Sequence, residues 1–187
     1  MIEKITQDRP LAVAMVENTP VGTIVLAASD LGLAYLSFHG LQDFKTLILD
    51  KSNIPGSRAL EIVHTAGRQV QEYFERKRKA FDIPFDLEGQ PEFRRQVLLE
   101  TSRIPYGKTL TYGELAARIH RPKAGRAVGG ALARNPFPIV IPCHRAVAAD
   151  GGLGGFQGGL AMKRALPQAE GVQVSEGGRV VAPSYWY

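Results

Sequence analysis

The 187-residue chain contains a single cysteine, Cys143, within residues 135–147, NPFPIVIPCHRAV. Pro142 precedes the thiol, and His144 and Arg145 follow it. A lone cysteine is more often an inert buried residue than a nucleophile. However, a histidine with a pKa near neutrality can act as a base for a nearby thiol. Arg145 either adds positive charge that favours a thiolate or anchors the backbone. The pattern makes Cys143 a candidate nucleophile.

The spacing of Cys143 and His144 argues against a direct hydrogen bond between them. Adjacent side chains point to opposite faces of a strand and do not face each other in a helix. We therefore expect a water molecule between thiol and imidazole. The histidine then needs a third group to hold its tautomer, and Glu170 is a candidate. The run IVI at 139–141 is predicted to be a buried strand that Pro142 ends, which would place the thiol in a rigid bend.

Other polar motifs point away from metal and nucleotide chemistry. One cysteine excludes an internal disulfide and a zinc site built from several thiolates, so we expect no metal. His39, His64 and His120 lie too far apart to show ligand spacing. The glycine-rich stretch 151–160, GGLGGFQGGL, lacks the Gly-Lys-Ser/Thr of a phosphate-binding loop, and Gln157 replaces the third glycine of the dinucleotide pattern. It is either a flexible loop or a wall where backbone closely approaches a flat ligand.

Two short helices precede the cysteine. Thr111 and Glu114 have the form of a capping box, which predicts a helix to about residue 119 that Pro122 prevents from continuing. A second helix is predicted over 123–134, because Asn135 precedes a proline. Two short helices with a tight break are typical of a helix-turn-helix.

The second of these helices has few large side chains. Gly125, Gly129 and Gly130 each cost about 1 kcal/mol relative to alanine in a helix interior. Such a surface either packs closely on another helix or lies close to a bulky partner. Arg126 is the one long cation among small neighbours, which favours close approach to DNA.

Charge is distributed unevenly along the chain. Residues 93–145 contain ten basic and two acidic residues, a net +8, whereas the remainder carries −3. This is the pattern expected of a protein that binds a phosphate backbone, although a solvated basic surface would look the same.

The elements predict an α+β protein with two domains. Strands at 23–27 and 33–38 around a turn form a hairpin, and helical spacing predicts a helix at 57–78 capped by Ser57. We expect a small N-terminal sheet and helix domain at 1–88 with a structural role. A mainly helical domain with the helix-turn-helix follows at 89–187, and its first helix starts near Pro91. No signal-peptide layout and no apolar run of about 20 residues occur, so we expect a soluble, cytoplasmic protein.

Several motifs resemble those of the O6-alkylguanine-DNA alkyltransferases, also called methylated-DNA–protein-cysteine methyltransferases. IPCHR at 141–145 looks like the active-site signature, and RAVGGALARNP at 126–136 looks like the recognition helix with its following asparagine hinge. YGELA at 112–116 and GGL at 158–160 also match. The resemblance is dense from about residue 93 to 171 and weaker before it.

The resemblance implies a role for each catalytic candidate. Cys143 accepts the alkyl group, His144 deprotonates the Cys143 thiol through a water molecule, and Glu170 orients the histidine. Tyr112 donates a proton to the departing guanine, and Asn135 braces the hinge beneath the site.

It also implies a DNA-binding face and a pocket. Arg126 takes the place of the flipped nucleotide in the base stack. Small residues of the recognition helix and Tyr112 approach the DNA; these small residues are Ala127, Gly129, Gly130 and Ala133. The pocket for the alkylated base is lined by Pro138, Arg145, Gln157, Gly158 and Gly159.

The implied activity is DNA repair by irreversible transfer of an alkyl group, methyl above all, from O6-alkylguanine to Cys143. O4-alkylthymine is an expected second substrate. The base is flipped out of double-stranded DNA approached through the minor groove. Neither a cofactor, a membrane nor an obligate protein partner is expected, so the protein would act as a monomer, and each molecule would act once.

One residue bears on the position of Glu170, and two alternative functions were compared with alkyl transfer. Pro167 predicts that the helix within 162–171 stops early, which affects where Glu170 lies. A non-catalytic protein that senses alkylated guanine would share the fold but carry tryptophan in place of the cysteine. A cysteine hydrolase would need an oxyanion hole and would not explain the basic helix-turn-helix.

Overall fold

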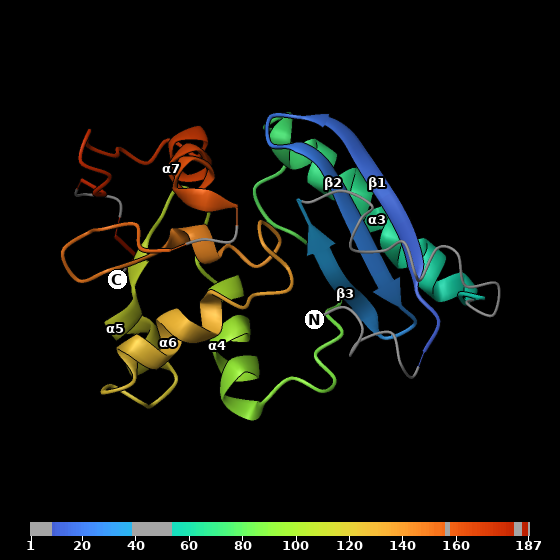
Figure 1. Ribbon diagram of the computed structural model, residues 1–187, viewed down its shortest axis with the longest axis horizontal. Helices are drawn as coiled ribbons and strands as arrows, with labels where there is room; N and C mark the ends of the chain where they lie inside the picture. The colour runs from blue at the N-terminus through green and yellow to red at the C-terminus, as the bar shows by residue number, and fades with distance from the viewer. Residues whose placement is uncertain (1–8, 39–53, 156–157, 182–184, 187) are drawn as a thin grey trace. The chain divides into compact units, whose positions relative to one another are not determined.

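The computed structural model describes residues 9–38, 54–155, 158–181 and 185–186, and it divides into two compact units, Met1–Gly89 and Gln90–Tyr187 (Figure 1). The division falls one residue after the boundary expected from the sequence. No helix of the described residues is long and apolar enough to cross a membrane.

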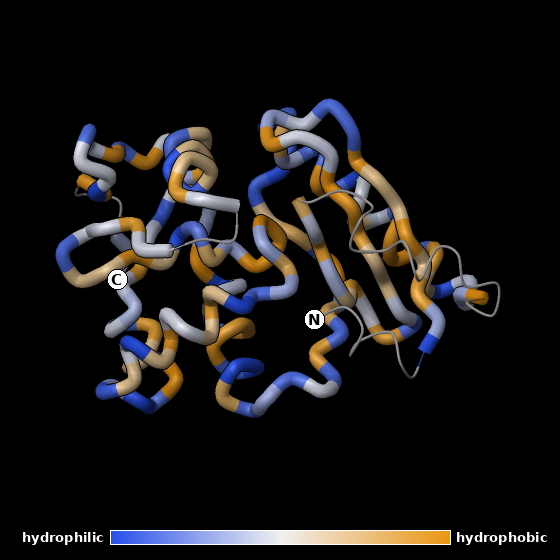
Figure 2. The backbone as a smooth tube through the Cα atoms, in the orientation of Figure 1, coloured by the Kyte–Doolittle hydropathy of each residue, from blue (hydrophilic) through white to orange (hydrophobic). Residues whose placement is uncertain are grey.

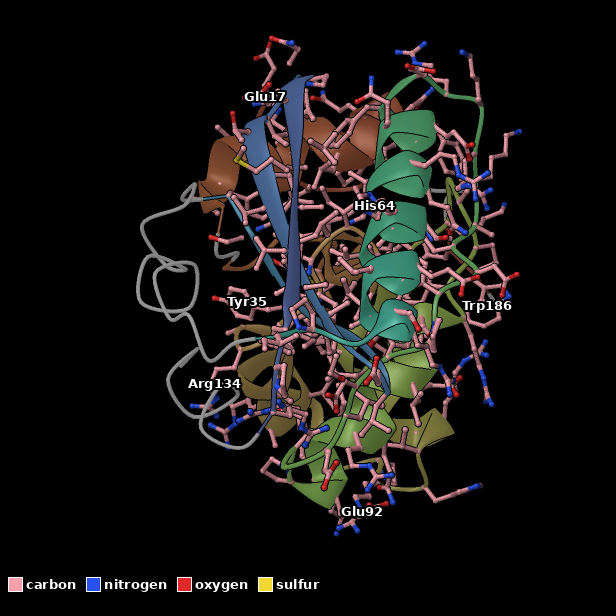
Figure 3. The ribbon with its side chains drawn as sticks, turned by 90° about the vertical axis from the view of Figure 1, so that its right-hand side faces the viewer. Glu17, Tyr35, His64, Glu92, Arg134 and Trp186 are labelled. Carbon is pink, nitrogen blue, oxygen red and sulfur yellow. The ribbon has the colours of Figure 1, made fainter. Side chains whose placement is uncertain are left out.

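The N-terminal unit is an antiparallel sheet with one helix packed against it (Figures 1 and 3). The strands are β1 (Ala12–Thr19), β2 (Gly22–Ser29) and β3 (Gly32–Ser37), in that spatial order. The predicted β2–β3 hairpin is present. Strand β1 was not predicted, because its half-exposed sequence AVAMVENT does not alternate cleanly between apolar and polar residues. Figure 2 shows hydrophobic residues along the strands and hydrophilic ones at the β1–β2 turn.

Helix α3 (Ser57–Phe74) buries one apolar face against this sheet. Its cap differs from the prediction, because Gly56 occupies the N-cap position and Ser57 is the first helical residue. The carboxylate of Asp30 accepts the hydrogen bond from the amide of Ala59 at 2.8 Å instead. A Cβ atom on Gly56 would lie 2.5 Å from that carboxylate, so only glycine allows this approach. The helix also ends at Phe74, earlier than the predicted residue 78, and Arg76 shortly after it has a positive φ of 58°.

The C-terminal unit is mainly helical, which together with the N-terminal sheet makes the fold α+β, as predicted. Its elements are α4 (Glu92–Ser102), β4 (Leu110–Thr111), α5 (Tyr112–Arg118), α6 (Gly125–Leu132), the 3-10 turn η2 (Cys143–Arg145), β5 (Ala146–Val147) and α7 (Gly159–Ala169). Strands β4 and β5 pair in parallel, and α4, α5 and α6 pack against one another.

The predicted capping box at the start of α5 is confirmed. The amide of Glu114 donates to the hydroxyl of Thr111 at 3.1 Å, and the amide of Thr111 donates to the carboxylate of Glu114 at 2.8 Å. At the other end His120 has a φ of 59°, and the amide of Arg121 donates to the carbonyl of Ala116 at 2.8 Å. This left-handed cap turns the chain sharply toward α6.

The glycines of α6 have different neighbours. A Cβ atom on Gly125 would lie 3.6 Å from the backbone of Gly113, an ordinary van der Waals distance, so α6 lies directly against α5 at this position. A Cβ atom on Gly129 would meet nothing within 4 Å, and one on Gly130 would meet only the guanidinium of Arg134, at 3.9 Å. The small residues therefore serve helix packing at one end of α6 and leave an open surface further along.

Two predictions about local structure are wrong. Residues 139–141 are buried but form turns rather than a strand, and Ile139 has a φ of 72°. Short-range bonds replace the strand ladder, such as the bond from the amide of Ile141 to the carbonyl of Phe137 at 2.8 Å. Helix α7 also continues through Pro167. The proline is buried and lies in the last turn of the helix, where the lack of an amide proton removes only one backbone hydrogen bond.

Candidate active site

Cys143 begins the single turn η2, and 5% of the residue is exposed. The side chain of Asn135, which follows α6, holds this turn. Its amide nitrogen donates to the carbonyl of Ile141 at 2.9 Å and to the sulfur of Cys143 at 3.1 Å, and its carbonyl oxygen accepts from the amide of Phe137 at 3.0 Å. One buried amide therefore both shapes the chain before the cysteine and supplies a hydrogen-bond donor to the thiol.

Glu170, the C-cap residue of α7, lies in the middle of a buried polar network. It contacts His144 Nε2 at 3.0 Å, and the guanidinium of Arg145 donates to both carboxylate oxygens at 2.8 Å. The amide of Gly107 adds a bond of 3.1 Å. Burial by itself would raise the pKa of Glu170, but the hydrogen bonds and charges of His144 and Arg145 hold that pKa well below its usual range. Glu170 is therefore an anion whenever the protein is folded at neutral pH.

The carboxylate determines the tautomer of His144. An ionised carboxylate can only accept hydrogen bonds, so Nε2 must carry the proton and Nδ1 is left as an acceptor. Nδ1 is buried and makes no hydrogen bond within the described residues. Burial lowers the pKa of His144 and outweighs the opposing effect of Glu170, so the ring is neutral near pH 7. A neutral imidazole with a free lone pair is suited to accept a proton.

The thiol itself is held in its protonated form. Burial raises the pKa of Cys143, while the hydrogen bond from Asn135 and the positive charge of Lys163 act in the opposite direction. A base is therefore required before the sulfur can act as a nucleophile. The amide of Asn135 and the charge of Lys163 already favour the thiolate.

Lys163 on α7 is a site residue that the sequence did not reveal. Only 1% of it is exposed, and its ammonium donates to the hydroxyl of Tyr112 at 3.0 Å and to the carbonyl of Gly155 at 3.2 Å. Burial lowers its pKa to about 8, although the charge of Cys143 opposes this. The spacing could have indicated its burial, since Lys163 lies three and four residues before the buried Leu166 and Pro167.

Tyr112, the first residue of α5, is enclosed by the glycine-rich loop. Burial raises its pKa, and the charge of Cys143 adds to this effect. Gly154 has a φ of 62°, and a Cβ atom there would lie 2.8 Å from the hydroxyl of Tyr112. The loop backbone thus approaches the tyrosine as closely as glycine permits, which favours the pocket-wall interpretation of the loop.

The residues expected to line a pocket for the alkylated base lie in different segments of the chain. Pro138 is buried near the cysteine turn, Gly158 is the N-cap residue of α7, and Gly159 is its first residue with a φ of 82°. Gln157 lies outside the described residues. Arg145 needs a correction, because its guanidinium is occupied by Glu170 and by the carbonyl of Ile104 at 2.6 Å. Arg145 therefore anchors the network and does not line a pocket.

The residues expected to contact DNA lie on or next to α6. Arg126 is its second residue and is exposed, as are Ala127 and Ala133, while Gly129 and Gly130 are half-buried. Like the polar network around the cysteine, these residues belong to the C-terminal unit.

Comparison with known proteins gives consistent matches over both units. Residues 13–87 match the family described as 6-O-methylguanine DNA methyltransferase, ribonuclease-like domain, and residues 92–172 match its DNA binding domain. A methylated-DNA–protein-cysteine methyltransferase of Methanosarcina acetivorans is 40% identical over 154 residues, which cover 82% of this chain and 95% of the relative. A constitutive one of Bacillus subtilis is 35% identical, over 75% of this chain and 84% of the relative. The crystal structure of Mycobacterium tuberculosis OGT in complex with DNA aligns with a TM-score of 0.69 and 33% identity, over 84% of this chain and 91% of the other.

Proposed function

Because the chain belongs to the 6-O-methylguanine DNA methyltransferase family, we propose a mechanism in which its residues carry out the family's reaction. The protein is a DNA-binding repair enzyme that transfers an alkyl group directly from alkylated DNA to a cysteine of its own. Cys143 is the one cysteine of the sequence, so it is the acceptor. The assignments that follow rest on the geometry around it.

The first step is removal of the thiol proton by His144. Neighbouring side chains on η2 cannot face each other, so the proton passes through a water molecule to Nδ1, the ring nitrogen that makes no bond within the described residues. The positive charge that forms on the imidazole is stabilised by Glu170, 3.0 Å from Nε2. The donor Asn135 and the ammonium of Lys163 stabilise the thiolate that remains.

The second step is in-line attack of the sulfur on the alkyl carbon. A carbon–sulfur bond forms while the bond from carbon to O6 breaks, and the bonding electrons move onto guanine. Tyr112 neutralises this charge by donating its phenolic proton to the base. Lys163 donates a hydrogen bond to the same phenol oxygen, so it stabilises the phenolate that is left behind. The product is a stable thioether, and one molecule of protein repairs one lesion.

The target atom must first leave the base stack. We assign this step to α6, whose open surface around Gly129 can lie in the minor groove. Arg126 projects from the start of this surface and takes the place of the flipped nucleotide. Flipping costs a few kcal/mol, and the planar guanidinium offsets part of that cost by stacking and by bonding the unpaired cytosine.

The observation that carries the proposal is the hydrogen-bonded chain from Asn135 to Cys143 beside the His144–Glu170–Arg145 network. Incubation with a duplex containing O6-methylguanine should add the mass of one methylene group to the peptide that bears Cys143. The product should plateau at one methyl group per protein molecule. Cys143→Ser should abolish transfer but retain duplex binding. Sustained multiple turnover, or methylation at another residue, would contradict the mechanism.

A non-catalytic protein that only senses alkylated guanine is not favoured. It would not require a thiol next to a hydrogen-bonded histidine, and the similar proteins of Methanosarcina acetivorans and Bacillus subtilis are methyltransferases. The experiment with O6-methylguanine decides the point, because such a protein would bind the duplex without gaining mass.

A further inference from the structure

A tight turn at residues 105–108 contacts the buried network around Glu170 from a segment that the mechanism does not use. The amide of Lys108 donates to the carbonyl of Pro105 at 3.1 Å, which closes a β-turn. Gly107, the third residue of the turn, has a φ of 72°, the left-handed conformation that a type II turn requires at this position. The turn lies between α4 and β4, outside both the cysteine motif and α7.

The turn supplies one of the hydrogen bonds to the carboxylate of Glu170. Oε1 is bonded by His144 Nε2 at 3.0 Å and by Arg145 Nη2 at 2.8 Å, while Oε2 is bonded by Arg145 Nε at 2.8 Å and by the amide of Gly107 at 3.1 Å. A carboxylate has about four lone-pair positions, so these bonds together fix the direction of the group. Without the amide of Gly107, Arg145 alone among the described residues would hold Oε2.

Gly107 also touches the backbone of Glu170. A Cβ atom on Gly107 would lie 2.9 Å from the carbonyl oxygen of Glu170. This is well inside van der Waals contact, and a backbone atom cannot swing aside as the end of a side chain can. A side chain at this position would therefore displace the C-cap of α7, from which Glu170 reaches His144.

Tyr106, the second residue of the turn, holds two further parts of the network. Its hydroxyl donates to the carbonyl of Ala169, the last residue of α7, at 3.2 Å. The last carbonyls of a helix lack a partner within the helix. The guanidinium carbon of Arg145 lies 5.7 Å from the centre of the Tyr106 ring, within the range of a cation–π interaction. One turn therefore contacts the end of α7, the carboxylate of Glu170 and the arginine that binds this carboxylate.

We propose that Tyr106 and Gly107 are positioning residues for alkyl transfer, because their turn holds the carboxylate of Glu170 in the direction that His144 requires. This inference rests on the proposed function, in which Glu170 stabilises the imidazolium that forms when His144 takes the thiol proton. A carboxylate that pointed away from Nε2 would leave that charge buried and unpaired, which is strongly unfavourable. Neither residue of the turn touches the reacting atoms, so both act through Glu170.

The pH dependence of transfer reports this positioning. The groups whose charges act on the imidazole are Glu170, Arg145 and Lys163. Burial lowers the pKa of His144, and the hydrogen bond and charge of Glu170 raise it. A variant that misplaces Glu170 should therefore lower this pKa further, so that the acid limb of the rate profile moves to lower pH. The plateau rate should fall as well, since the imidazole becomes a weaker base.

Gly107→Ala tests the proposal, with Gly178→Ala in the same unit as its matched control. Both glycines have a φ of 72°, so both substitutions introduce similar backbone strain. A Cβ atom on Gly178, however, would meet nothing within 4 Å. The rate at which free O6-benzylguanine alkylates Cys143 would be measured as a function of pH. Gly107→Ala should lower the plateau rate several-fold and move the acid limb to lower pH, whereas Gly178→Ala should change neither quantity.

Two substitutions of Tyr106 provide the test if Gly107→Ala fails to fold. Tyr106→Phe retains the ring beside Arg145 and loses only the bond to Ala169, so its profile should stay close to that of the parent. Tyr106→Leu loses both contacts and should show the lower plateau and the shifted limb. If Tyr106→Leu kept the parental profile, or if Gly107→Ala behaved like Gly178→Ala, the positioning role would be wrong.

Nitrogen NMR of labelled histidine separates this inference from the proposed function, because it needs no substrate. In the parent, His144 should be a neutral imidazole with its proton on Nε2, and in Gly107→Ala and Tyr106→Leu it should no longer occupy this single form. If the parent gained no mass from O6-methylguanine DNA while these variants still altered the His144 signal, the proposed function would fail but the turn would still position Glu170. An unaltered signal in both variants would overturn the inference.

Discussion

At the scale of single residues, burial and hydrogen bonding have opposing effects on the pKa values of the site. Burial raises the pKa of Cys143 and lowers that of His144, so the resting pair is neutral. Glu170 remains charged because His144 and Arg145 both bond to it. The neutral pair avoids the cost of burying unpaired charges, and the ions form only when the reaction requires them.

Lys163 is the exception, since its ammonium is buried without a carboxylate partner in the described residues. Its pKa falls from 10.5 to about 8, mainly by burial, which corresponds to a cost on the order of 3 kcal/mol for holding the charge in the fold. We predict that Lys163→Met raises the melting temperature at pH 7 and slows alkyl transfer, because the hydrogen bond to Tyr112 is lost. Calorimetry and the rate with free O6-benzylguanine measure the two effects.

The pH dependence provides the control. Between about pH 8 and 10.5 the unfolded state binds more protons at this lysine than the folded state, so the stability of the parent should rise with pH across that window. The difference in the free energy of unfolding between the parent and Lys163→Met should therefore shrink across that pH window. Lys108→Met, at an exposed position, should show neither effect. If the difference in stability between the parent and Lys163→Met stayed constant from pH 7 to 10.5, the lysine would not be buried in its charged form.

At the scale of elements, α6 packs within its unit over eight residues and, in the proposed mechanism, also binds DNA. Gly125 lies against α5, where a Cβ atom would be in van der Waals contact with the backbone of Gly113. Gly129 has no such neighbour, so packing within the unit does not require a glycine there. A glycine in a helix interior costs about 1 kcal/mol relative to alanine, and close approach of DNA, as proposed above, would account for that cost.

Gly129→Ala separates the two roles. We predict that it increases the free energy of unfolding by about 1 kcal/mol through helix propensity. It should also weaken binding to duplex DNA, because the new methyl group keeps α6 from lying as deep in the groove. Denaturant unfolding and a duplex titration measure these quantities. A gain in stability with unchanged affinity would show that this face of α6 does not contact DNA.

At the scale of the whole molecule, the residues proposed for the chemistry and the helix proposed to bind DNA lie in one unit, while the N-terminal unit supplies neither group of residues. The +8 charge of residues 93–145 also falls entirely within the C-terminal unit. In the proposed mechanism, repair of duplex DNA therefore depends on two separable abilities of that unit, transfer to the thiol and extrusion of the base.

Arg126→Ala tests this separation. We predict a large loss in the rate of duplex repair, on the order of tenfold for each 1.4 kcal/mol of flipping energy that is no longer offset. Reaction with free O6-benzylguanine should hardly change, because a free base needs no flipping. The quantity to compare is the ratio of the two rates in variant and parent. Equal losses on both substrates would assign Arg126 to the fold or the pocket.

The sequence by itself determined the features that depend on neighbours along the chain. The capping box of Thr111 and Glu114 spans three residues, and the β2–β3 hairpin joins adjacent strands. Helix α4 begins directly after Pro91, and a proline at the start of a helix is likewise a signal that depends only on neighbouring residues. The assignment of Cys143 as the alkyl acceptor likewise came from its immediate neighbours together with the family motif, and it stays a prediction.

Only the tertiary structure decided which distant groups meet. Lys163 bonds Tyr112 across 51 positions, and Arg145 bonds Glu170 across 25. The turns at 139–141 replace the predicted strand because local hydrogen bonds, several made by the side chain of Asn135, satisfy the buried backbone. A buried polar group forms its hydrogen bond with the partner that the fold places next to it. The spacing of residues along the chain does not indicate which partner that will be.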